Sequence, residues 1–164
     1  MATNLFLQLC EELHIPHTRD YTNQRFDGHP QKDTLLGLQQ PLAEYGVESE
    51  GVRFADKAEA LATMRTPFVA QVANGLAVVT ALTDTEVCYT CNDKSIRVSH
   101  ETFMELWSGV TLLVAPSSNA GEPHYAEHRH AERMQRKSLY AVMWHLRQVM
   151  KELKSHLNLF LVFL

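Results

Sequence analysis

The stretch from residue 67 to residue 98 constrains the fold most, because it consists of short apolar segments separated by tight-turn signals. Asn74-Gly75 separates the first pair of segments, and this dipeptide between apolar runs is the strongest short-range signal for a β-hairpin. Residues 83–86 and Asn92-Asp93 separate the following pairs. The pattern predicts an antiparallel meander of four strands, over residues 68–73, 76–82, 87–91 and 94–98.

Helical patterns lie on both sides of this meander. Asn4 is expected to cap a first helix that stops near Pro16, and residues 31–45 carry apolar side chains at helical spacing. Pro41 is expected to kink this second helix, and Gly46 stands where a left-handed residue ends a helix. Further elements are expected at residues 47–54 (strand), 56–64 (helix), 99–107 (helix capped by Ser99) and 110–115 (strand). Helices followed by antiparallel strands indicate the α+β class.

Charge divides the chain into two parts. Residues 1–125 hold eight Lys or Arg against sixteen Asp or Glu, a net charge of −8, whereas residues 126–164 hold seven against three, a net charge of +4. The boundary falls in the Pro-, Ser- and Gly-rich stretch 116–123, a composition typical of a linker. We therefore expect a domain over residues 1–116, a linker over 117–124 and a helix over 125–164.

The overall composition excludes several classes of protein. Apolar residues make up 45% of the chain and charged residues 21%, which is typical of a globular protein and not of a disordered one. Three cysteines, an odd number, argue against a secreted disulfide scaffold. A net charge of −4 and a pI near 6.1 argue against a nucleic-acid partner. The glycine-rich and H-E-x-x-H motifs of nucleotide and zinc sites do not occur, so no cofactor or metal is predicted.

The last forty residues predict one long helix, because no Gly or Pro follows Tyr125. One face of it carries Leu139, Val142, Met143, Leu146, Val149, Met150, Leu153 and Leu157. Residues 157–164 are almost wholly apolar, but a bilayer requires about twenty such residues. Three interpretations stay open: the beginning of a transmembrane helix of a longer protein, an amphipathic helix on a partner or a membrane surface, or a helix folded back onto the domain. The first places the domain on the cytoplasmic side, because basic residues adjoin the span.

Cys88 and Cys91 have the C-x-x-C spacing of redox dithiols and of half a zinc site. They fall in a predicted strand, where side chains three residues apart point to opposite faces. A zinc site would need a second pair of ligands, which Cys10 alone does not supply. A structural role is therefore favoured for these cysteines, with redox or metal chemistry as the alternatives.

Histidines gather at the beginning of the predicted long helix, at His124, His128 and His130. Pro123 precedes them, and this context favours an exposed polar helix start over a metal site. His29-Pro30 is expected in a turn before the second helix.

Several segments resemble the papain-like domain of bacteriocin-processing cysteine peptidases, which cleave double-glycine leader peptides. In that family the domain is found at the N-termini of peptide-exporting ABC transporters. The similar segments are residues 34–49, 66–72, 76–79 and 98–116, and the resemblance extends over residues 4–116. His29-Pro30, Trp107-Ser-Gly109 and Gly121-Glu-Pro123 are similar to a variant of this domain fused to bacterial vitamin K epoxide reductase-like membrane proteins. The resemblance implies a papain-like fold with N-terminal helices and an antiparallel sheet.

The positions that carry catalysis in that family hold other residues here. The family's Cys stands at the start of the first helix, which falls near Ala2 or Thr3, and Cys10 lies about two turns further along. The family's His position is Leu76, and its Asp position falls near Thr90 or Cys91. Without the Cys–His pair, peptide hydrolysis by this mechanism is not expected.

Two hypotheses of function follow. The leading one is a catalytically inactive, peptide-binding or regulatory module of a membrane protein of transporter or thiol-oxidoreductase type. It would lie at the cytoplasmic face of the bacterial inner membrane, with a peptide and, through its C-terminal helix, the membrane as partners. The alternative is an enzyme: a cysteine peptidase that uses Cys10 on leader peptides, or a thiol redox protein that uses Cys88 and Cys91.

Overall fold

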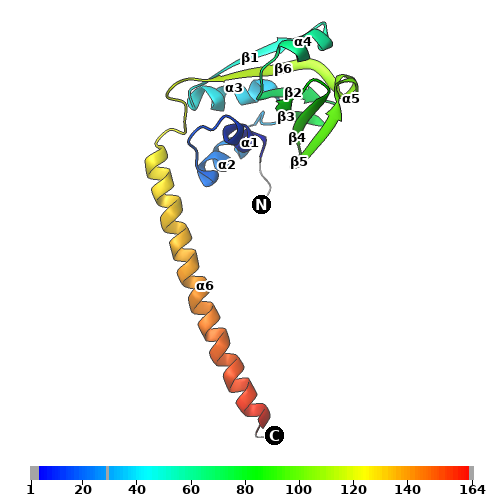
Figure 1. Cartoon of the computed structure of the whole chain (residues 1–164). Helices are drawn as coiled ribbons and strands as arrows, with labels where there is room; N and C mark the ends of the chain where they lie inside the picture. Colours follow the sequence, from blue (N-terminus) through cyan, green and yellow to red (C-terminus); the bar gives the residue numbers. More distant parts are fainter. Residues whose placement is uncertain (1–3, 29, 163–164) are drawn as a thin grey trace. The chain divides into compact units, whose positions relative to one another are not determined.

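The computed structural model describes residues 4–28 and 30–162, and side chains as far as Lys151. The described chain forms a six-stranded antiparallel sheet in the order β1-β6-β2-β3-β4-β5 (Figure 1). Its strands are β1 (Val47–Arg53), β2 (Phe68–Val72), β3 (Gly75–Leu82), β4 (Glu86–Cys91), β5 (Lys94–Ser99) and β6 (Trp107–Pro116). The predicted α+β class is confirmed. His29 and the side chains of residues 157–164 lie outside the described residues.

The four-stranded meander is confirmed, with β2, β3, β4 and β5 paired in chain order. Its first turn contains Gly75 at a φ of 122°, which a residue with a side chain rarely adopts. Its last turn contains Asn92 and Asp93 at φ values of 50° and 61°, and both residue types tolerate this left-handed region. Local turn chemistry therefore sets the register of the meander.

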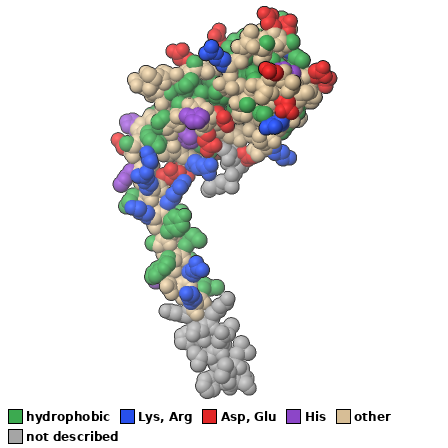
Figure 2. All heavy atoms as spheres, in the orientation of Figure 1, with side chains coloured by type: hydrophobic (Ala, Val, Ile, Leu, Met, Phe, Trp, Pro, Cys, Tyr) green, Lys and Arg blue, Asp and Glu red, His purple; other side chains and the backbone are tan. Residues whose placement is uncertain are grey.

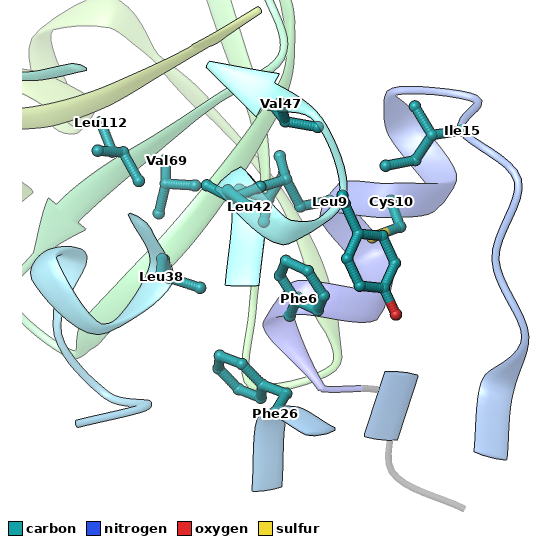
Figure 3. Close-up of a cluster of buried hydrophobic side chains, with 12 residues drawn as sticks. Phe6, Leu9, Cys10, Ile15, Phe26, Leu38, Leu42, Val47, Val69 and Leu112 are labelled. Carbon is teal, nitrogen blue, oxygen red and sulfur yellow. The ribbon is translucent and has the colours of Figure 1, made fainter. Parts of the chain in front are cut away.

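Three helices pack on one face of the sheet: α1 (Leu5–Glu12), α2 (Arg19–Asp27) and α3 (Leu35–Glu44). Figure 3 shows the core between these helices and the sheet, where Phe6 of α1 lies close to Phe26 of α2. The rings of Phe6 and Phe26 stack at 5.7 Å between centroids, and Tyr45 meets Phe6 edge-on at 5.1 Å. The sheet contributes Val47, Val69, Val78 and Leu112 to this core.

The opposite face of the sheet is covered by α4 (Lys57–Thr63) and α5 (His100–Leu106). Phe68 belongs to this second core and its neighbour Val69 to the first, as the alternation of a strand requires. Lys57 connects the elements here, because its Nζ donates to the carbonyl oxygens of Met104 at 2.8 Å and Trp107 at 2.6 Å.

The structure differs from the sequence expectation at three elements. Helix α2 was not expected, because it is strongly polar and buries only Thr22 and Phe26. The helix expected over residues 31–45 begins later, at Leu35, where the Thr34 hydroxyl accepts a hydrogen bond from the Gly37 amide at 3.0 Å. Strand β6 begins at Trp107 and not at residue 110, so the preceding helix ends at Leu106.

Residues 117–124, the expected linker, are held against the domain by hydrogen bonds. The amide of Gly121 donates to Tyr45 O at 2.8 Å, and the amide of Glu122 donates to Pro16 O at 2.8 Å. The Glu122 carboxylate is buried and accepts hydrogen bonds from both the amide and the hydroxyl of Thr18, the latter at 2.8 Å. These contacts make the segment a packed part of the first unit.

The chain divides into two compact units, residues 1–125 and 126–164. All of α6 (Tyr125–Val162), a helix of 38 residues, except its first residue belongs to the second unit. In the described residues, none of the helices combines the length and the apolar character that crossing a membrane would require.

Candidate functional site

A cleft opens where the start of α1 faces the turns of the meander. Its volume is about 540 Å³. It is lined by Asn4, Leu5, Gln8, Phe26, Asp27, Lys32, Asp33, Asn74, Gly75, Leu76, Thr90, Asn92 and Asp93. These residues come from the start of α1, from the end of α2 with the loop that follows it, and from the first and third turns of the meander with the strand residues beside them.

The first wall of the cleft is the first turn of α1. Asn4 caps this helix through its side-chain oxygen, which accepts from the Leu7 amide at 2.7 Å. The side-chain amide of Asn4 also donates to Asn23 Oδ1 on α2, at 2.8 Å. These two bonds hold the start of α1, whose residues Leu5 and Gln8 line the cleft.

The second wall comes from the sheet. Leu76 lies at the start of β3, directly after the Asn74-Gly75 turn, and Thr90 lies on β4, where it pairs with Val78 of β3. The Asn92-Asp93 turn that follows β4 belongs to the same wall. In an antiparallel meander the first and third turns lie at the same end of the sheet, so these distant residues converge there.

Charge is unevenly distributed in the cleft. Asp27, Asp33 and Asp93 contribute three carboxyl groups, and Lys32 contributes one amino group. Lys32 Nζ lies 3.8 Å from Asp27 Oδ1. The described lining is therefore acidic overall, and it favours a cationic over an anionic ligand.

Two of the positions named in the family resemblance lie at this cleft. Leu76 and Thr90 both line it, and Leu5 is the first residue of α1. Ala2 and Thr3 lie outside the described residues. Among the lining residues that the structure describes, none is a Cys or a His. What the sequence did not indicate was the contribution of Gln8, Lys32 and Asp33, for which no local motif exists.

Cys10 lies away from this cleft, in the first hydrophobic core (Figure 3). Its side chain is fully buried among apolar neighbours such as Phe6 and Leu9. Burial raises the pKa of Cys10 to about 12, and the nearby carboxylates of Glu122 and Glu11 add to this rise. A thiol in this environment stays protonated at neutral pH.

Cys88 and Cys91 alternate along β4, with Cys88 half-buried and Cys91 buried. Burial raises the pKa of Cys91. Cys10, Cys88 and Cys91 are free thiols. No group of three or more His, Cys, Asp or Glu side chains within the described residues could hold a metal ion.

Comparison with known proteins finds one family model that matches most of the chain. The family model described as Peptidase C39 family matches residues 9–119. A search of curated proteins found no match.

Solved structures share the fold. The peptidase domain of Streptococcus ComA, a bi-functional ABC transporter involved in a quorum sensing pathway, is 22% identical, with a TM-score of 0.53 over 66% of this chain and 85% of that chain. A double glycine motif protease from an AMS/PCAT transporter, in complex with the leader peptide, is 17% identical, with a TM-score of 0.52 over 58% of this chain and 71% of that chain.

The N-terminal peptidase C39 like domain of the toxin secretion ATP-binding protein from Vibrio parahaemolyticus is 16% identical, with a TM-score of 0.54 over 70% of this chain and 95% of that chain. Because the family model covers more than half of the chain and the folds agree, the chain belongs to the peptidase C39 family.

Proposed function

We propose that the domain binds a peptide in the cleft at the start of α1 and does not cleave it. The observation that carries this proposal is the identity of the cleft residues. Leu76, which lines the cleft, stands where the family resemblance implies a His. The position of the family's Asp falls near Thr90 or Cys91. Hydrolysis by a cysteine peptidase requires a thiolate and an imidazole that can transfer a proton, and a leucine side chain can do neither.

The cleft offers the chemical groups that a peptide needs. Leu5, Phe26 and Leu76 can bury apolar side chains, whereas Gln8 and Asn74 can bond to a peptide backbone. Peptide binding depends on such pockets and hydrogen bonds, not on a nucleophile. The leader peptide bound to a relative of the same fold supports this choice of ligand.

We also propose a setting for this activity: a regulatory module of a membrane protein, at the cytoplasmic face of the bacterial inner membrane. Two of the solved relatives described above are named as parts of transporters. The similarity of Trp107-Ser-Gly109 and Gly121-Glu-Pro123 to the variant fused to vitamin K epoxide reductase-like proteins supports the same setting.

Binding and cleavage of a fluorescent double-glycine leader peptide test the proposal. The full chain should raise the fluorescence anisotropy of the peptide, and mass spectrometry should find the peptide intact. Leu76→Lys introduces a charge into the apolar wall and should weaken binding about tenfold, which corresponds to about 1.4 kcal/mol.

A matched variant controls for the added charge. Leu36→Lys places the same group at an exposed position of α3 outside the cleft, so it should leave binding unchanged. Equal binding by Leu76→Lys and the unaltered chain would remove the cleft from the proposal. Cleavage of the peptide, whether or not Cys10→Ala abolishes it, would show an active peptidase instead.

A further inference from the structure

Helix α6 carries an exposed apolar face. Six side chains on it are between 46% and 66% exposed: Leu139, Val142, Met143, Leu146, Val149 and Met150. At 3.6 residues per turn, these side chains project within an arc of about 120°. Such an arc is wider than the narrow seam of a two-stranded coiled coil and is typical of a helix that lies along an apolar boundary.

The side of the helix away from this face is basic. At 100° per residue, all Lys and Arg side chains of residues 133–151 fall within an arc of about 100°, which begins beside the apolar face and extends to the opposite side of the helix. They are Arg133, Arg136, Lys137, Arg147 and Lys151. No Asp or Glu occurs between Glu132 and Glu152. Figure 2 shows basic and hydrophobic side chains next to one another along α6.

Two aromatic side chains lie among the cations. Tyr140 and Trp144 are 73% and 64% exposed, and at 100° per residue they project about 120° and 160° from the centre of the apolar face. They belong to the polar side of the helix and not to the apolar face.

We infer that residues 133–151 of α6 lie flat on a bilayer that contains anionic phospholipids. The apolar face enters the boundary of the acyl chains. Arg136 and Arg147, which project within about 100° of the centre of this face, meet the phosphate groups, and the other three cations add to the attraction by the anionic surface. This inference shares only its membrane setting with the proposed function, and it does not depend on the cleft.

A second copy of the chain fits this apolar face less well than an anionic bilayer does. Pairing two such helices would bring together cations of the same segment, with no acidic side chain between Glu132 and Glu152 to balance them. The first unit offers no apolar counterpart either, since Leu36 alone, of the exposed large hydrophobic side chains in the described residues, lies outside α6. Charge complementarity and apolar exposure together favour an anionic lipid surface.

Vesicle sedimentation with the full chain tests this inference without any peptide. The chain should sediment with vesicles of phosphatidylglycerol and phosphatidylcholine in equal parts, but not with vesicles of phosphatidylcholine alone. The fraction of the chain that sediments measures binding. Added salt should weaken binding, because it screens the attraction between the cations and the phosphates.

Two variants that add the same charge separate the apolar face from general electrostatics. Leu146→Glu places a carboxylate in the apolar face and should abolish sedimentation. Gln148→Glu places it on the opposite side of the helix and should leave sedimentation largely unchanged. Arg147→Gln should weaken binding about fivefold, as the loss of one cation near an anionic surface predicts. Circular dichroism checks that each variant keeps its helix.

Four results would overturn the inference. The chain could remain in solution with anionic vesicles, or sediment equally with neutral ones. Leu146→Glu and Gln148→Glu could bind alike, which would leave the apolar face without a role. A dimer in sedimentation equilibrium that Leu146→Glu dissolves, without vesicle binding, would assign the face to a second copy.

Discussion

Thr111 places a hydroxyl group in the middle of the sheet. It lies on β6 between Val52 of β1 and Ala70 of β2, and it is fully buried. Among the described side chains, its Oγ1 is the buried polar atom that lacks a hydrogen-bond partner. A buried hydroxyl without a partner costs about 1–3 kcal/mol relative to water.

Thr111→Val should therefore stabilise the protein. The substitution keeps the branched shape and removes the unpaired hydroxyl, so the free energy of unfolding in urea should rise by about 1 kcal/mol. Thr22→Val is the matched control, since Thr22 is also fully buried but its Oγ1 lies 3.0 Å from Tyr45 Oη. That variant should lose about 1 kcal/mol. A loss of equal size in both variants would reveal a partner for Thr111.

The thiols should differ in reactivity. Because burial raises the pKa of Cys10 to about 12, its thiolate becomes abundant only as the pH approaches that value. Iodoacetamide at pH 8 should therefore modify half-buried Cys88 first and leave Cys10 intact, as mass spectrometry of proteolytic fragments can show. Urea-unfolded chain, in which all three thiols are accessible, provides the control. Rapid modification of Cys10 in the folded protein would revive the alternative of an active cysteine peptidase.

At the scale of elements, the loop between α2 and α3 depends on one glycine. Gly37 lies in the first turns of α3, and a Cβ atom there would stand 1.9 Å from the carbonyl oxygen of Gln31. The next residues of the loop, Lys32 and Asp33, form a wall of the cleft. The close approach of loop and helix thus shapes the candidate binding site.

Gly37→Ala should displace this loop. The added methyl group forces the backbone at Gln31 to move, so the free energy of unfolding should fall by about 1–3 kcal/mol. Gly51→Ala on β1 is the control, because nothing lies within 4 Å of its added Cβ, and it should change stability by less than about 0.5 kcal/mol. Leader-peptide affinity should fall in the first variant alone. Equal free energies of unfolding for the two variants would show that the loop can move away from the added methyl group without loss of stability.

For the whole molecule, the elements set by local chemistry were the ones that the sequence predicted. Asn74-Gly75 and Asn92-Asp93 dictate turns within a few residues of themselves, so the meander and its strands were foreseen. Helix α2 was not, because its burial depends on packing against α1 and not on an apolar pattern of its own.

The cleft could be foreseen only in part. The family resemblance pointed to Leu76 and Thr90, but the convergence of residues 4 to 93 at one place depends on the complete sheet and helices. Long-range hydrogen bonds also could not be predicted from the sequence, because no local pattern indicates them. The composition of residues 117–124 is that of a linker, yet Glu122 bonds to Thr18, 104 positions away in the chain.

That bond has a mechanical consequence. A pulling force applied to the chain beyond Tyr125 first meets the hydrogen bonds of residues 121 and 122 with Tyr45, Pro16 and Thr18. The force therefore acts on the connection between α1 and α2 before it acts on β6. Tension applied through α6 would displace the helices that border the cleft before it separates the strands of the sheet.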